Sequence, residues 1–284
     1  MNNFTIRNMT RSELDWAVDM AANEGWNPGL NDADAFYAQD PEGFLVGLLN
    51  GSPIGCISAV SYGGDFGFVG FYIVARPHRG KGYGIKLWRA GMDRMLGHVV
   101  GLDGVFEQQD NYRKSGFDFQ YSNIRFEYRN TLQDVTPRSS SELIKAAPDV
   151  LKELMAYESA LFPCAREPFL SKWLALPDSV ALVSHSEGRI NGYGVIRKCR
   201  SGSKIGPLFA DNEDVADMLF WNLCASVAPD SLIYLDVPEV NAQGLTLAER
   251  YGMKKVFGTA RMYAGPAPEL DLNRIFGVTT FELG

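Results

Sequence analysis

The chain repeats its own sequence pattern at a fixed interval. Residues 181–197 (ALVSHSEGRINGYGVIR) resemble residues 44–60 (FLVGLLNGSPIGCISAV), and residues 248–256 (AERYGMKKV) resemble residues 112–120 (YRKSGFDFQ). The offset between matching positions is 137 residues in the first comparison and 136 in the second. A constant offset of about half the chain is typical of two tandem copies of one domain, and it limits the possible folds more than any other feature.

A change in composition marks the division between the two copies. Residues 133–143 (QDVTPRSSSEL) are rich in Ser, Thr and Pro, which is typical of a linker. We therefore expect an N-terminal domain at residues 1–132, a linker at 133–143 and a C-terminal domain at 144–284. Domains of this length are large enough to bury a core of their own.

Local patterns predict both strands and helices in the first copy. Thr10 is placed to cap a helix, Asn50-Gly51 is a strong hairpin signal, and residues 65–74 (DFGFVGFYIV) form an apolar run typical of a central strand. The predicted order is β-α-α-β-β-β-α-β-α-β, complete by about Asn130. This predicts an α/β fold (an α+β mixed sheet) with two tandem domains, each a mostly antiparallel twisted sheet flanked by helices.

Composition and charge exclude several classes of protein. Hydrophobic residues make up 46% of the chain and charged residues 21%, as in soluble globular proteins. Neither a bilayer-length apolar run nor a signal peptide is recognisable, so we expect a cytoplasmic protein with no membrane partner. A net charge of −7 argues against nucleic acid and suits a small cationic or neutral substrate. The four cysteines lack metal-ligand spacing, so no metal is expected, and the oligomeric state is not indicated.

A loop with alternating glycines, residues 76–84 (RPHRGKGYG), links the apolar strand to a predicted helix. We call this segment the glycine loop. It matches neither the P-loop pattern nor the dinucleotide fingerprint. Two readings remain: a tight turn, or a row of free backbone N–H groups at a helix N-terminus that holds an anion.

The glycine loop, the order of elements and the segment NYRKSGF (111–117) together resemble the GNAT superfamily of N-acetyltransferases. The resemblance covers most of residues 4–130. It implies acetyl-CoA as co-substrate and a backbone N–H near Ile73 or Val74, at a bulge in the central strand, that binds the acetyl carbonyl. It also implies that Tyr112 protonates the leaving thiolate. The implied cofactor-binding residues of the loop are Arg79, Gly80, Lys81, Gly82, Tyr83 and Gly84.

The acceptor side of the site is less well indicated. A free amine must lose a proton before it attacks a thioester, so a base is required. Glu24, in the segment EGWNPG, is the first candidate for this base, although a solvated carboxylate is an alternative reading. Trp26, Asn27 and Tyr72 are the expected substrate-binding residues, because aromatic and rigid residues shape small-molecule pockets.

The second copy lacks the features that carry the predicted chemistry. It has no glycine after Gly206 at the corresponding strand-to-helix junction, and Ala248 stands where the first copy has Tyr112. We therefore expect a catalytic first domain, a degenerate second domain and a single cofactor site in each chain.

The leading functional hypothesis is an acetyl-CoA-dependent N-acetyltransferase. It would transfer an acetyl group to the amine of a small molecule by direct attack in a ternary complex, without a metal. Two alternatives remain open at this point: a non-catalytic acyl-CoA-binding regulatory module, and an acetyltransferase that acts on protein lysines or N-termini.

Overall fold

A computed structural model of the chain describes residues 3–131, 143–146 and 148–284. Most of the predicted linker, residues 133–142, lies outside the described residues, and residue 143 begins a strand. The described helices do not combine the length and the apolar character that crossing a membrane requires.

The first half follows the predicted order of elements. Thr10 caps the first helix through a reciprocal pair of hydrogen bonds with Glu13, and positive φ angles at Asn50 and Gly51 form the expected tight hairpin turn. The elements are β1 (Phe4–Asn8), α1 (Arg11–Asn23), α2 (Asp32–Gln39), β2 (Phe44–Leu49), β3 (Ser52–Ser61), β4 (Phe66–Val74), α3 (Tyr83–Arg94), β5 (Val99–Val105), α4 (Gln109–Lys114) and β6 (Asp118–Arg129), with short 3₁₀ turns at Arg76–His78 and Phe106–Gln108.

The second half repeats this order and then adds a short strand. Its elements are β7 (Leu143–Lys145), α5 (Leu151–Glu158), α6 (Glu167–Trp173), β8 (Ser179–Ser186), β9 (Arg189–Lys198), β10 (Ser203–Ala210), α7 (Glu213–Ala225), β11 (Leu232–Pro238), α8 (Ala242–Arg250), β12 (Lys254–Ala264) and β13 (Ile275–Gly277), with 3₁₀ turns at Pro148–Val150 and Leu272–Arg274. The internal repeat of the sequence is therefore a repeat of structure.

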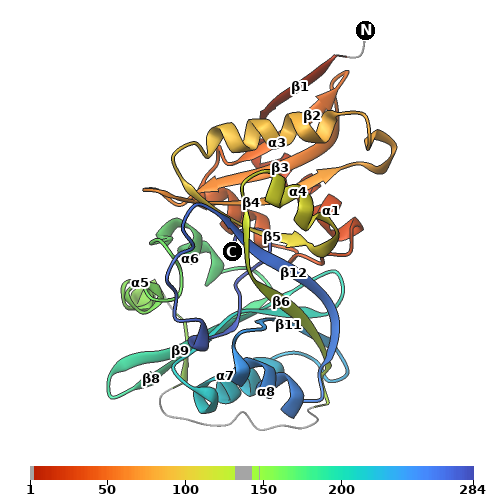
Figure 1. The fold of residues 1–284 in the computed structure, drawn as a ribbon. Helices are drawn as coiled ribbons and strands as arrows, with labels where there is room; N and C mark the ends of the chain where they lie inside the picture. Colours follow the sequence, from red (N-terminus) through yellow and green to blue (C-terminus); the bar gives the residue numbers. More distant parts are fainter. Residues whose placement is uncertain (1–2, 132–142, 147) are drawn as a thin grey trace.

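The described strands of both halves form one continuous sheet, in the order β1-β2-β3-β4-β5-β12-β6-β11-β10-β9-β8-β7. In each half the last strand of the repeated order pairs with the other half. β12 of the second half pairs with β5, and β6 of the first half pairs with β11. The two strands, which we call the exchanged strands, also pair with each other at the centre of the molecule (Figure 1). The predicted mixed, mostly antiparallel sheet flanked by helices is confirmed, and the exchange joins its two parts.

Ion pairs with almost no exposure to solvent also hold the halves together. Asp32 of α2 accepts a hydrogen bond from Arg197 of β9 at 2.9 Å, and Asp236 of β11 pairs with Arg125 of β6 at 2.6 Å. A buried charge that loses its partner is strongly destabilising. The position of one half on the other is therefore set by specific contacts.

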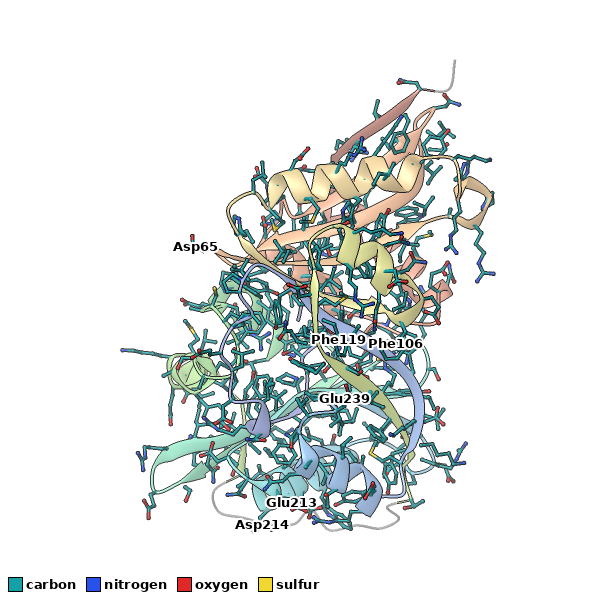
Figure 2. The ribbon with its side chains drawn as sticks, viewed as in Figure 1. Asp65, Phe106, Phe119, Glu213, Asp214 and Glu239 are labelled. Carbon is teal, nitrogen blue, oxygen red and sulfur yellow. The ribbon has the colours of Figure 1, made fainter. Side chains whose placement is uncertain are left out.

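The C-terminus lies between the two halves. Figure 1 shows the end of the chain at the middle of the molecule, and Figure 2 shows side chains filling the space around it. Residues 278–284, which we call the C-terminal tail, are all buried. Leu283 accepts a hydrogen bond from the hydroxyl of Tyr62 at 2.6 Å. The last residues of the chain are thus part of a hydrophobic core that both halves share.

Candidate active site

A cavity opens where two central strands of the first half diverge. β4 and β5 pair as parallel strands from Phe66–Val99 to Val69–Leu102, and no pairing between them continues beyond this point among the described residues. β4 then carries the expected bulge. Its register with β3 shifts between Gly70 and Ile73, and Phe71 has a φ of 47°. The cavity between the diverging strands has a volume of about 470 Å³.

Both halves contribute to the wall of this cavity. The first half supplies residues of β4, β5, α3, α4, the glycine loop and the loop after α1, and the second half supplies residues of β12 and the C-terminal tail. The lining residues are Glu24, Trp26, Val69, Gly70, Phe71, Tyr72, Ile73, Val74, Arg79, Gly80, Gly84, Trp88, Leu102, Asp103, Gly104, Val105, Gln108, Tyr112, Phe257, Thr259, Phe281 and Glu282.

The glycine loop forms an open row of backbone N–H groups beside the cavity. Gly80 and Gly82 have φ angles of 73° and 81°, a conformation that favours glycine, and a Cβ atom at either would have no neighbour within 4 Å. Gly82 is the N-cap of α3 and supplies no side-chain cap. Within the described residues, nothing accepts a hydrogen bond from the N–H groups of Gly80, Lys81 and Gly82. A helix N-terminus of this kind favours an anion.

The charged side chains of the glycine loop bond to the protein itself. Arg79 donates from Nε to the carbonyl of Val74 at 2.7 Å and from a terminal nitrogen to Oε1 of Glu24 at 2.5 Å. Lys81 donates to the carbonyl of Pro77 at 2.8 Å. Tyr83 packs against Phe4, with 4.8 Å between ring centroids. The backbone of the loop, more than its cations, is therefore free for a ligand.

Tyr112 lies in the cavity wall beside other aromatic rings. Its ring centroid is 5.6 Å from that of Trp88, which in turn is 5.3 Å from Tyr72. Gly104 allows this close approach, because a Cβ there would overlap the Tyr112 ring. Burial, together with the neighbouring Tyr72, raises the pKa of Tyr112 to about 12. The phenol is therefore protonated at neutral pH and can donate its proton.

The loop after α1 brings two of its three predicted residues to the cavity. Glu24 and Trp26 line it, and Glu24 is the residue bonded to Arg79. Asn27 is instead bonded to the turn between β9 and β10, where its side chain donates to the carbonyl of Ser201 at 2.9 Å. Asn27 thus fixes the loop to the second half and is not among the lining residues.

Residues that sequence reasoning missed complete the other end of the cavity. Phe257 and Thr259 come from the exchanged strand β12, and Phe281 and Glu282 come from the C-terminal tail. The apolar pattern of the last residues, IFGVTTFELG, could have indicated a buried tail. Nothing local in the sequence indicates that this tail reaches the first half.

The corresponding divergence in the second half is filled by its own chain. β10 and β11 pair from Ser203–Ile233 to Ile205–Leu235 and then separate. β13 enters the gap, where it pairs with β10, and the next residue, Val278, donates to the carbonyl of Asp236 in β11. The following helix, α7, is capped by the side chain of Asn212. The strand-to-helix junction of this half therefore lacks both the open cavity and the uncapped helix start.

The described residues contain no group of three or more His, Cys, Asp and Glu side chains that could hold a metal ion.

Comparison with family models identifies the same domain type in both halves. Residues 10–117 match the acetyltransferase (GNAT) family, and residues 154–277 match an acetyltransferase (GNAT) domain. The chain is 30% identical over 272 residues to holothin acyltransferase of Pseudoalteromonas sp. (strain SANK 73390), an alignment that covers 95% of this chain and 92% of the relative.

Solved structures share the fold at low sequence identity. A putative acetyltransferase from Pyrococcus horikoshii superposes with a TM-score of 0.80 at 19% identity, covering 99% of this chain and 96% of the other. A tandem GNAT protein from the clavulanic acid biosynthesis pathway superposes with a TM-score of 0.66 at 13% identity, covering 94% and 100%. These similarities establish the tandem architecture.

Proposed function

Because the chain belongs to the GNAT family, with two GNAT domains in tandem, it is an acyltransferase, and we propose that it transfers an acetyl group from acetyl-CoA to the amine of a small molecule. The transfer is a direct attack in a ternary complex. One observation carries this proposal: the unbonded N–H groups of the glycine loop open beside a cavity that extends to the β4 bulge and Tyr112.

The residues of the first half fit a CoA thioester. The pyrophosphate is held by the backbone N–H groups of Gly80, Lys81 and Gly82 and by the start of α3, with Arg79, Tyr83 and Gly84 around it. The acyl carbonyl accepts a hydrogen bond from the backbone of β4 near Ile73 or Val74, since this part of the strand has left its parallel partner β5. When bound, the thioester supplies an activated acyl group.

Tyr112 supplies the proton that the leaving sulfur takes up. Its phenol is neutral at physiological pH and lies in the wall of the cavity. Tyr72 and Trp26 line the space left for the acceptor. Asn27 holds the loop after α1 against the second half. Glu24 stays the base predicted from sequence. One of its oxygens already accepts a hydrogen bond from Arg79, so only the other is available to an amine.

The two halves have different roles in this proposal. The N-terminal domain, residues 1–132, binds the cofactor, and the C-terminal domain, residues 144–284, is a degenerate copy that completes the acceptor side. The insertion of β13 between β10 and β11 supports one cofactor site per chain, because it occupies the space that a second thioester would need.

The experiment is a CoA-release assay with acetyl-CoA and a panel of amines. The panel contains holothin, suggested by the name of the relative, together with tryptamine, putrescine and a lysine-containing peptide. Propionyl-CoA and longer acyl-CoA thioesters replace acetyl-CoA in parallel. Turnover with a small amine and acetyl-CoA supports the proposal. Tight acetyl-CoA binding with no turnover on any acceptor would contradict the proposal and favour the alternative of a non-catalytic acyl-CoA-binding module.

Tyr112→Phe tests the proton donor. We expect kcat to fall by roughly 10²-fold or more, since positioned acids contribute about 10²–10⁴-fold. The Kd of acetyl-CoA, measured by calorimetry, should stay within about twofold. The matched control is Tyr37→Phe in α2, which does not line the cavity and should keep normal turnover. An unchanged kcat in Tyr112→Phe would remove the phenol from the mechanism.

A further inference from the structure

Tyr72 of β4 directs its hydroxyl toward the start of α3, beside the glycine loop. A Cβ atom on Gly84 would lie 2.9 Å from that hydroxyl oxygen, and Gly84 is the second residue of the helix. The Tyr72 ring packs against Trp88, one turn further along α3, with 5.3 Å between ring centroids. The side chain therefore lies on the face of β4 that α3 covers, and its polar end is at the helix N-terminus.

The Tyr72 hydroxyl is available to a ligand. The residue is half-buried and lines the cavity together with Gly80 and Gly84. Within the described part of the chain its hydroxyl forms no hydrogen bond, and burial alone raises the pKa of this phenol above its ordinary value. A phenol that keeps its proton at neutral pH can donate a hydrogen bond to an anion.

The cationic side chains of the glycine loop are already bonded to the protein. Arg79 donates to a backbone carbonyl and to Glu24, and Lys81 donates to another backbone carbonyl. The three open backbone N–H groups of the loop therefore need further donors to satisfy a diphosphate, because each phosphate presents several strong acceptor oxygens. Tyr72 offers such a donor from the strand that precedes the loop.

The second half has a leucine at the position that corresponds to Tyr72. Val74 of β4 and Ala210 of β10 occupy equivalent positions, because each pairs with the same glycine of the repeated hairpin. Two residues earlier in these strands lie Tyr72 and Leu208. Leu208 is fully buried in the apolar core of the second half. The repeated fold thus forms with an apolar side chain at this position, so the hydroxyl of Tyr72 is not a requirement of the fold.

We infer that the hydroxyl of Tyr72 donates a hydrogen bond to the diphosphate of the acyl-CoA thioester and so completes the anion site of the glycine loop. The inference rests on the proposed function and adds a side-chain ligand to its cofactor site. The ring of Tyr72 still lines the space left for the acceptor, so the ring and the hydroxyl of one side chain serve different substrates.

Tyr72→Phe removes the hydroxyl and keeps the ring. We expect the Kd of CoA, measured by calorimetry, to rise roughly tenfold or more, as for the loss of a hydrogen bond to a charged group. The inhibition constant of ADP against acetyl-CoA should rise by the same factor. Turnover of S-acetylpantetheine, which carries no phosphate, and the melting temperature should not change. The matched control is Tyr37→Phe in α2, outside the cavity wall, which should bind CoA normally.

Gly84→Ala tests the position of the hydroxyl without removing it. The new Cβ would overlap the Tyr72 hydroxyl, whereas the next nearest atoms lie at the ordinary contact distances of 3.5 and 3.6 Å. We expect this variant to displace the phenol and to weaken CoA binding. In the Tyr72→Phe background the same substitution should change the Kd by less than about twofold, because the displaced group is already absent. Fully additive effects would contradict a hydroxyl that acts from beside Gly84.

The outcomes separate this inference from the proposed function. Equal losses of CoA and ADP affinity in Tyr72→Phe, with normal turnover of S-acetylpantetheine, support the inference. Unchanged CoA affinity overturns it and leaves the acyltransferase proposal standing. Impaired use of S-acetylpantetheine at normal ADP affinity also overturns it, because the hydroxyl would then contact the pantetheine arm. Failure of the wild-type chain to bind acetyl-CoA overturns the proposed function itself.

Discussion

Substituting Gly70 by Ala tests whether the contact between the C-terminal tail and β4 matters for activity. The new Cβ would lie 2.9 Å from the carbonyl carbon of Glu282, whereas carbon atoms pack best at about 3.5–4.0 Å. The tail and the strand must therefore separate by at least about 0.6–1.1 Å, since the carbonyl oxygen of Glu282 would lie closer to the new Cβ than the carbon does. The atoms that clash belong to the backbone of the tail and to the new Cβ, so no flexible side chain can move aside to relieve the overlap. Overpacking of this kind costs about 1–3 kcal/mol, and a displacement of about 1 Å in an active site can lower activity about 10²-fold.

Activity and stability are measured together on Gly70→Ala and on Gly67→Ala. Gly67 lies in the same strand, but its Cβ would meet the sulfur of Met95, at the end of a flexible side chain. We expect both variants to lose a few degrees of melting temperature, and only Gly70→Ala to lose about 10²-fold in kcat/KM. The acetyl-CoA affinity of both should remain within about twofold. If Gly70→Ala destabilises the chain but keeps the kcat/KM of Gly67→Ala, the tail does not position the reaction.

Two further predictions concern the glycine loop and the buried ion pairs. Gly82→Ala places a side chain in the left-handed region at a cost of about 1–2 kcal/mol, and should weaken acetyl-CoA binding about tenfold or more by calorimetry. Gly188→Ala, with a φ of 74° and equally open surroundings, is its control and should bind normally. Asp236→Ala leaves Arg125 buried without its carboxylate, and should lower the free energy of unfolding by about 3–5 kcal/mol in urea titration. A loss below 1 kcal/mol would contradict the importance of that pair.

Much of the first half could be predicted from local sequence. The N-cap at Thr10, the turn at Asn50-Gly51 and the glycine loop depend on residues close together in the chain, so their patterns are sufficient. The constant offset between the copies likewise predicted one fold occurring twice. The alternating glycines of the loop indicated either a tight turn or a backbone open to an anion, and Gly80 and Gly82 do adopt positive φ angles in open surroundings.

The exchange of β6 and β12 could not be predicted in the same way. The backbone groups of β6 and β12 would be hydrogen-bonded equally well if each strand paired within its own half or with the other half. Backbone hydrogen bonds between strands depend little on which side chains the strands carry. Which half each strand pairs with depends instead on side-chain contacts between residues more than a hundred positions apart. Arg125 and Asp236, for example, meet only in the exchanged arrangement.

The sequence by itself determined the tandem repeat, the mixed sheet, the glycine loop and the position of Tyr112, since each follows from short-range patterns. Only the tertiary structure decided what surrounds the proposed reaction centre. It paired Glu24 with Arg79, tied Asn27 to the second half and brought Glu282 against Gly70. These contacts join segments up to 212 positions apart (282 − 70). Packing and charge neutralisation across the two halves, rather than local propensity, therefore formed the acceptor end of the cavity.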